Sequence, residues 1–126
     1  MFESTPEQLA YHKLLILYTL KKIEQGLTGW QLNQVLLEKD LMNYFSIQTN
    51  LNQLIESKLV KLYTKSEIDY YALTQLGLET LESFMNRIPE DIRQLIDDYI
   101  DDNEYNWLSE SYLKAESEYI RKNDQE

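Results

Sequence analysis

The chain has 126 residues, no cysteine and a formal net charge of −10, with 22 acidic against 12 basic side chains. That length suits one domain with its own core, and the lack of cysteine excludes disulfides, thiol catalysis and zinc–thiolate sites. Because the first residues are not basic and the longest apolar run, 14–18, is too short to span a bilayer, we expect a cytoplasmic protein without a membrane partner.

Capping boxes mark the starts of the first two predicted helices. Thr5 with Gln8 opens the first helix, and Thr28 with Gln31 opens the second, while Gly26 is a natural stop between them. Apolar residues fall on nearly every side of the first helix, so we expect it to be central and buried. The second helix is predicted to turn its apolar residues inward: Trp30, Leu32, Val35, Leu36 and Leu37.

A third helix is predicted from a cap at Ser46 to about Lys58, after a turn at Asn43 and Tyr44. Its apolar residues recur at helical spacing and leave an amide-rich face on the opposite side. That spacing buries one face of the helix in a core and leaves the other face free for contacts.

Two short strands follow, over residues 59–64 and 68–73, with a polar turn between them. A helix pair followed by a hairpin is the layout of a winged helix-turn-helix. The predicted fold class is therefore mainly α with a small β-hairpin, a winged helix-turn-helix with additional C-terminal helices. We expect the winged domain to occupy residues 1–88 and an acidic helical extension to occupy residues 89–126.

Thr74 is predicted to cap a fourth helix and Pro89 to begin a fifth, which a polar stretch at 101–104 separates from a weaker sixth. The apolar residues after Pro89 exceed what a small winged core needs, so we expect them to pair two chains in a homodimer. Packing against the first helix is the alternative. The residues predicted for the dimer contact are Ile92, Leu95, Ile96, Tyr99, Ile100, Trp107 and Tyr112.

The third helix is the candidate for contact with double-stranded DNA, because asparagine and glutamine amides pair with adenine in the major groove. The residues predicted at this interface are Ser46, Gln48, Thr49, Asn50, Asn52 and Gln53 on the helix, and Lys61, Tyr63 and Lys65 on the wing. Residues 46–74 hold as many carboxylates as lysines and no arginine, so few phosphates are neutralised per chain and binding needs a dimer. A polar face that is merely solvated is the alternative.

Several segments resemble known proteins. The run 70–77, Tyr-Tyr-Ala-Leu-Thr-Gln-Leu-Gly, resembles the strand-to-helix junction of many winged-helix regulators. A wider resemblance, over about residues 9–104, is to a bacterial family of unknown function with a winged-helix fold, near PadR-type and MarR-type transcriptional regulators. It implies a DNA-binding regulator; a winged-helix module that binds a protein partner and no DNA is the alternative. The segments that carry it are Lys13–Tyr18, Leu27–Thr28, Asn43–Phe45, Leu54–Val60 and Asn86–Pro89.

No group of residues predicts catalysis, so we expect no enzyme activity, no cofactor and no bound metal. His12 is the only histidine, and the sequence shows no nucleophile paired with it. The carboxylates of Asp97, Asp98, Asp101 and Asp102 recur at helical spacing. They lack the alternating ligands and central glycine of a calcium loop, which favours a solvated face.

Overall fold

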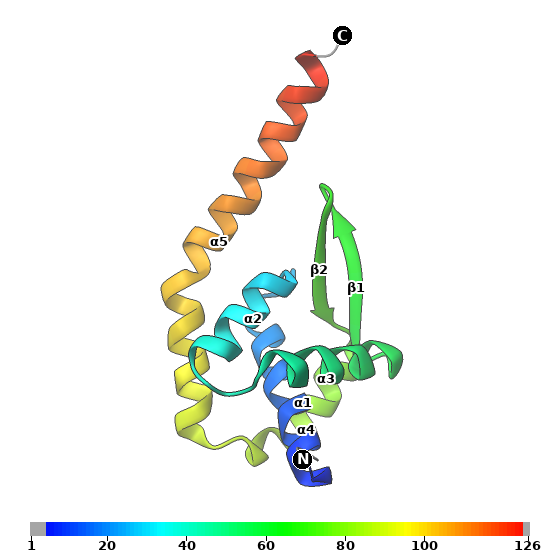
Figure 1. The fold of residues 1–126 in the computed structure, drawn as a ribbon, viewed down its shortest axis with the longest axis vertical. Helices are drawn as coiled ribbons and strands as arrows, with labels where there is room; N and C mark the ends of the chain where they lie inside the picture. The colour runs from blue at the N-terminus through cyan, green and yellow to red at the C-terminus, as the bar shows by residue number, and fades with distance from the viewer. Residues whose placement is uncertain (1–4, 125–126) are drawn as a thin grey trace.

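The computed structural model describes residues 5–124, with side chains described as far as Trp107. In that part of the chain it holds five α-helices, one short 3₁₀ helix and one hairpin, which confirms the predicted class (Figure 1). None of the helices described combines the length and the apolarity needed to cross a membrane. The elements are α1 (Pro6–Lys21), α2 (Gly29–Glu38), α3 (Tyr44–Glu56), β1 (Val60–Lys65), β2 (Ile68–Leu73), α4 (Gln75–Phe84), η1 (Met85–Arg87) and α5 (Glu90–Asp124).

Helix α1 is the centre of the core, as its all-round apolar pattern predicts. Every residue over 14–20 is buried, and α1 contacts each of the other four α-helices as well as β2. Its first turn is held by the predicted capping box, in which Gln8 N donates to Thr5 Oγ1 and Thr5 N donates to Gln8 Oε1. The second predicted box, between Thr28 and Gln31, is also confirmed.

The apolar residues of helix α2 do not all point inward as predicted. Trp30 and Leu37 are 64% and 41% exposed, so the predicted inward orientation is wrong for these two residues. Leu32, Val35 and Leu36 are buried as predicted. These three share one helical face at spacings of three and four, and positions 30 and 37 fall on the opposite face.

Strands β1 and β2 form an antiparallel hairpin with Val60 opposite Leu73 at its base. Ser66 and Glu67 both have positive φ, which a type I′ turn requires of its two central residues. An isolated bridge to Leu27 borders β2 on its other side. The hairpin is therefore tied to the loop between α1 and α2 as well as to the end of α3.

The joint between α3, the hairpin and α4 depends on close backbone contact. The predicted cap Thr74 is confirmed, since its Oγ1 accepts a hydrogen bond from Gly77 N at 3.0 Å and donates to the Lys58 carbonyl at 2.7 Å. A Cβ on Gly77 would lie 2.0 Å from the carbonyl oxygen of Leu59, so only glycine allows this approach. Helix α3 and the hairpin are thus held to α4 through the Thr74 hydroxyl and the close approach of Gly77 to the Leu59 backbone.

Helix α5 is continuous, so the predicted break at 101–104 and the separate sixth helix are wrong. Ile100 and Trp107, seven positions apart on one helical face, are both buried in the core. Asn103 Nδ2 donates to the Tyr99 carbonyl at 2.8 Å. Each aspartate or asparagine costs a helix at most about 0.7 kcal/mol. The burial of Ile100 and Trp107, which lie on either side of the polar stretch, outweighs that cost. The second half of α5 extends beyond the other elements (Figure 1).

Candidate nucleic-acid interface

Helix α3 is capped by Asn43, and the predicted cap at Ser46 is wrong. Asn43 Oδ1 accepts a hydrogen bond from Ser46 N at 2.7 Å, which makes Ser46 the third helical residue. Met42, immediately before the cap, is buried and anchors the chain at this point. Asparagine and serine are both good caps, so the sequence alone does not separate them. The earlier start adds Tyr44 and Phe45 to the helix.

Two of the predicted DNA contacts, Ser46 and Asn50, make side-chain hydrogen bonds within the protein. Ser46 Oγ lies 3.0 Å from Nδ1 of His12. Asn50 is 1% exposed, and its Nδ2 donates to the Ser46 carbonyl at 2.8 Å and to Ser46 Oγ at 3.2 Å. A side chain as buried as Asn50 cannot reach a base edge, so the prediction is corrected for Asn50, whereas Ser46 is half-buried. The physical reason is helical periodicity, because position 50 lies one turn from both Ile47 and Leu54 on the buried face.

The Ser46–His12 pair joins residues 34 positions apart, so no local pattern predicts it. Burial lowers the pKa of His12 below its ordinary value, which favours the neutral ring. In the part of the chain that the structure describes, no carboxylate bonds to the other ring nitrogen. The pair therefore lacks the orienting acid of a hydrolytic triad, and its geometry is that of a polar joint between α1 and α3.

The other four predicted contacts on α3 lie toward solvent. Asn52 and Gln53 are exposed, and Gln48 and Thr49 are half-buried. Among the described residues, none of these four side chains donates or accepts a hydrogen bond. Their amide and hydroxyl groups are therefore free to bond a partner along one side of the helix.

Exposed aromatic side chains accompany this polar face. Tyr44 and Phe45, in the first turn of α3, are 60% and 78% exposed, and Trp30 lies exposed in the first turn of α2. Sequence reasoning missed all three as surface groups. A helix start at Ser46 left Tyr44 and Phe45 in a turn, and Trp30 was expected in the core.

On the hairpin, Lys65 is exposed next to the turn, and Tyr63 is held by the protein. The Tyr63 hydroxyl donates to the Gln25 carbonyl, and its ring stacks on Tyr70 with centroids 5.5 Å apart. Burial raises the pKa of Tyr63, so this hydroxyl stays protonated. Tyr63 therefore fixes the hairpin against the loop after α1, which leaves Lys65 as the free cation near the tip within the described chain.

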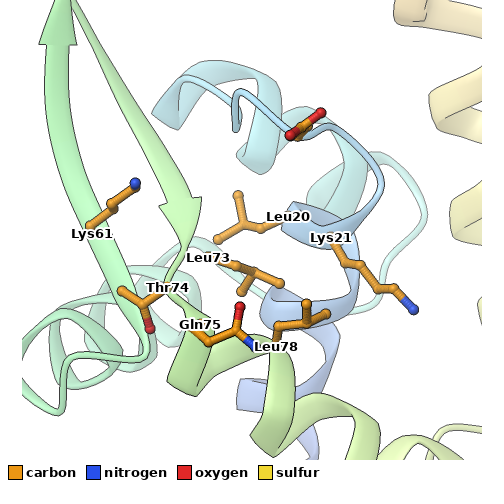
Figure 2. A pocket seen from close by; sticks show the side chains of 8 residues that line it. Leu20, Lys21, Lys61, Leu73, Thr74, Gln75 and Leu78 are labelled. Carbon is orange, nitrogen blue, oxygen red and sulfur yellow. The ribbon is translucent and has the colours of Figure 1, made fainter.

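Lys61 lines a cavity of about 510 Å³ between the hairpin, the end of α1 and the start of α4 (Figure 2). Lys21 and Glu24 line the same cavity, so one carboxylate offsets part of its positive charge. The apolar side chains of the lining are Leu20, Leu73 and Leu78.

The segment from α3 to the end of the hairpin carries as many positive as negative side chains. The lysines are Lys58, Lys61 and Lys65, and the carboxylates are Glu56, Glu67 and Asp69. Since each neutralised phosphate contributes a salt-dependent increment of affinity, one chain gains little from counterion release.

The residues predicted for a dimer contact fall into three groups. Buried in the core of the same chain are Ile96, Ile100 and Trp107. Half-buried on α5 are Ile92, Leu95 and Tyr99. Tyr112 lies outside the residues whose side chains the structure describes. The alternative of packing within the chain therefore holds for the central members of the set.

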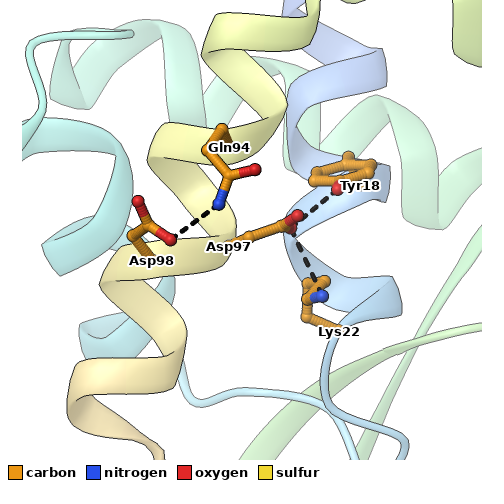
Figure 3. Close-up of polar contacts among 5 residues, drawn as sticks. All are labelled: Tyr18, Lys22, Gln94, Asp97 and Asp98. Atoms are coloured by element: carbon orange, nitrogen blue, oxygen red, sulfur yellow. Dashed lines mark hydrogen bonds and ion pairs between the residues drawn. The ribbon is translucent and has the colours of Figure 1, made fainter.

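Polar contacts hold α5 against α1 (Figure 3). The Tyr18 hydroxyl donates to Asp97 Oδ1 at 2.7 Å, and Lys22 Nζ lies 3.3 Å from the same oxygen. Burial raises the pKa of Tyr18, so the hydroxyl remains a donor. Gln94 Nε2 donates to Asp98 at 2.8 Å on the same helix. Where the structure describes side chains, no three histidine or carboxylate groups gather in an arrangement that could hold a metal ion.

The chain matches one protein family and resembles one solved structure. The family described as a domain of unknown function, DUF4364, matches residues 12–126. Among solved structures, the crystal structure of SSV1 F-93 is similar, with a TM-score of 0.51 and 17% identity over 79% of this chain and 98% of that one. At that identity the likeness supports the winged-helix-like fold alone. No curated protein matches the sequence.

Proposed function

The chain belongs to the DUF4364 family of unknown function, and we propose that it is a winged-helix, DNA-binding transcriptional regulator that acts as a homodimer. One observation carries the proposal: Gln48, Thr49, Asn52 and Gln53 line the solvent side of α3 with unpaired polar groups, beside a hairpin. The winged-helix-like fold supports it. The relation to PadR-type and MarR-type regulators is part of the same proposal.

In the proposed mechanism α3 enters the major groove with its first turns leading. The amides of Gln48, Asn52 and Gln53 pair with adenine N6 and N7, and Thr49 bonds a base edge or a phosphate. The exposed ring of Phe45 contacts a thymine methyl group. Direct contacts to base edges thus supply specificity, while Lys61 and Lys65 add phosphate contacts from the wing.

Dimerisation belongs to the proposal because one chain supplies few phosphate contacts. Since Ile96, Ile100 and Trp107 are already buried, we place chain pairing on residues 108–124, in the half of α5 that extends beyond the other elements (Figure 1). Two chains double the phosphate contacts and present two α3 helices to successive grooves. The apolar residues that recur in this part of the sequence are Leu108, Tyr112, Ala115 and Tyr119.

Fluorescence anisotropy with random-sequence and genomic duplexes tests the proposal at low salt. Contacts from Lys61 and Lys65 of two chains give a salt slope of about −3.6, so raising salt from about 50 to about 200 mM weakens binding roughly 150-fold. We expect saturable binding at micromolar protein with that dependence. No binding by micromolar dimer at low salt would end the proposal.

A second function, docking of a protein partner through α3 without DNA, is favoured by the exposed aromatic side chains. Trp30, Tyr44 and Phe45 are groups of the kind that anchor protein interfaces. Under this function the chain has no DNA affinity at low salt. A partner recovered by affinity capture is then lost from the Phe45→Ala variant, whose removed ring lies on the surface.

A further inference from the structure

A separate cavity opens between α1, the end of α3 and α4, away from the solvent face of α3. Its volume is about 210 Å³, and five of its lining side chains are large and apolar. Leu14 and Leu17 come from α1, Leu54 from α3 and Leu59 from the turn after it, and Phe84 comes from α4. Leu17 and Leu54 are each 1% exposed, whereas Phe84 is 39% exposed. The cavity therefore has a buried apolar floor and one wall that reaches solvent.

The charged residues that line this cavity, Lys13 and Arg87, are both cationic, although the chain carries a net charge of −10. The Arg87 guanidinium lies over the Phe84 ring, 4.8 Å from its centroid. Within the described residues, neither cation forms an ion pair with a carboxylate. By contrast, the larger cavity beside Lys61 contains Glu24. The smaller cavity is thus apolar inside, and its lining carries two positive charges that no carboxylate of the described residues neutralises.

We propose that this cavity binds a small organic acid, with its apolar body among the leucines and its carboxylate at Lys13 and Arg87. A guanidinium pairs with a carboxylate through two parallel hydrogen bonds, and an ammonium adds a point charge. The volume equals about seven water molecules, which suits an apolar body of roughly six carbons. An amine of the same size is repelled by both cations, so the site selects for the negative charge.

Occupancy of this cavity acts on α3. Leu54 lies in the last turns of α3 and Leu59 immediately precedes β1, so an acid between them and α1 shifts the helix that carries the candidate DNA contacts. This regulatory consequence rests on the proposed function. Binding of the acid does not, and it is measured without DNA.

NMR titration of the full, isotope-labelled chain with hexanoate tests the proposal, with hexylamine and hexan-1-ol as probes of the same body without the negative charge. We expect saturable shifts centred on the amides of Leu14, Leu54 and Phe84. Hexanoate should bind at least about tenfold more tightly than hexylamine, which corresponds to about 1.4 kcal/mol. Equal binding of hexanoate and hexylamine, no saturable shift with hexanoate, or shifts centred on the cavity beside Lys61 would overturn the proposal.

Surface variants locate the site. We expect Arg87→Gln and Lys13→Gln each to weaken hexanoate binding several-fold. Ala10→Leu, which fills part of the cavity and keeps both charges, should abolish binding. Lys21→Gln removes the same charge at the other end of α1 and should leave the affinity unchanged. Unchanged affinity in the Arg87 and Ala10 variants would contradict the site. Loss of DNA binding in any of these proteins bears on the proposed function and not on this test.

Discussion

Ser46 Oγ and His12 Nδ1 lie 3.0 Å apart, which joins the helix proposed to contact DNA to the central helix α1. Asn50 extends this joint with a 3.2 Å bond to Ser46 Oγ. Partly buried polar groups of this kind fix geometry, because each loses a partner if the helices shift. The placement of α3 therefore depends on a contact that includes one titratable ring.

That ring makes stability depend on pH. Burial lowers the pKa of His12 below its ordinary value of 6.5, so the unfolded chain takes up a proton more readily than the folded one. The resulting stability is fully present above about pH 6.5 and is lost as pH falls through the lowered folded pKa. We expect the wild type to lose more of its Tm than His12→Gln between about pH 7.5 and about pH 5.5. An equal fall of Tm in the wild type and in His12→Gln over this pH range would contradict the prediction.

Gly77→Ala should destabilise the protein by about 2 kcal/mol or more. The new Cβ would lie 2.0 Å from the Leu59 carbonyl oxygen, and that backbone group cannot rotate away without moving the joint between α3 and α4. Urea unfolding measures the loss. Gly29→Ala is the matched control, because its Cβ would meet Tyr71 at an ordinary 3.5 Å in the first turn of α2. Similar free energies of unfolding for the two variants would count against this contact.

Lys58→Gly should raise the free energy of unfolding by up to about 1 kcal/mol. Lys58 has φ of 65°, a left-handed conformation that its Cβ disfavours, directly after the C-cap of α3. Lys58→Ala removes the same charge and keeps the Cβ, so it should give no gain. The prediction fails if urea unfolding shows alanine to stabilise as much as glycine.

The Tyr18–Asp97 hydrogen bond should contribute about 1 kcal/mol to the attachment of α5. A double-mutant cycle of Tyr18→Phe and Asp97→Ala in urea unfolding measures this coupling, because each change removes the hydrogen bond. The control is Lys22→Gln, because Lys22 and Asp97 keep 31% and 24% of their side-chain surface exposed and such ion pairs contribute little. Additive effects of the Tyr18 and Asp97 changes would show that the bond does not couple the helices.

Local contacts made the helix starts predictable from sequence. Thr5, Thr28 and Thr74 each cap a helix through a bond to an amide three residues on, and such bonds depend on a few neighbouring residues only. The start of α3 was not predictable, because Asn43 and Ser46 are both good caps and the buried anchor at Met42 belongs to tertiary packing.

The candidate site was predictable in part. Helical spacing identified the solvent side of α3, including Asn52 and Gln53, and the same spacing applied to Asn50 places it on the buried face. The Ser46–His12 contact was not predictable, because its partners lie far apart in sequence. The acid-binding cavity likewise needs α1, α3 and α4 in their folded arrangement before Lys13 and Arg87 line one space.

The most direct test compares DNA binding by Gln53→Glu and Asn86→Asp on one duplex at low salt. Both changes turn an exposed side-chain amide into a carboxylate, one on the solvent face of α3 and one in η1. A carboxylate at position 53 loses the amide donor and repels phosphate, so we expect at least about tenfold weaker binding for Gln53→Glu and an affinity within about twofold of wild type for Asn86→Asp. Equal affinities for the two variants would contradict the claim that this face of α3 contacts DNA.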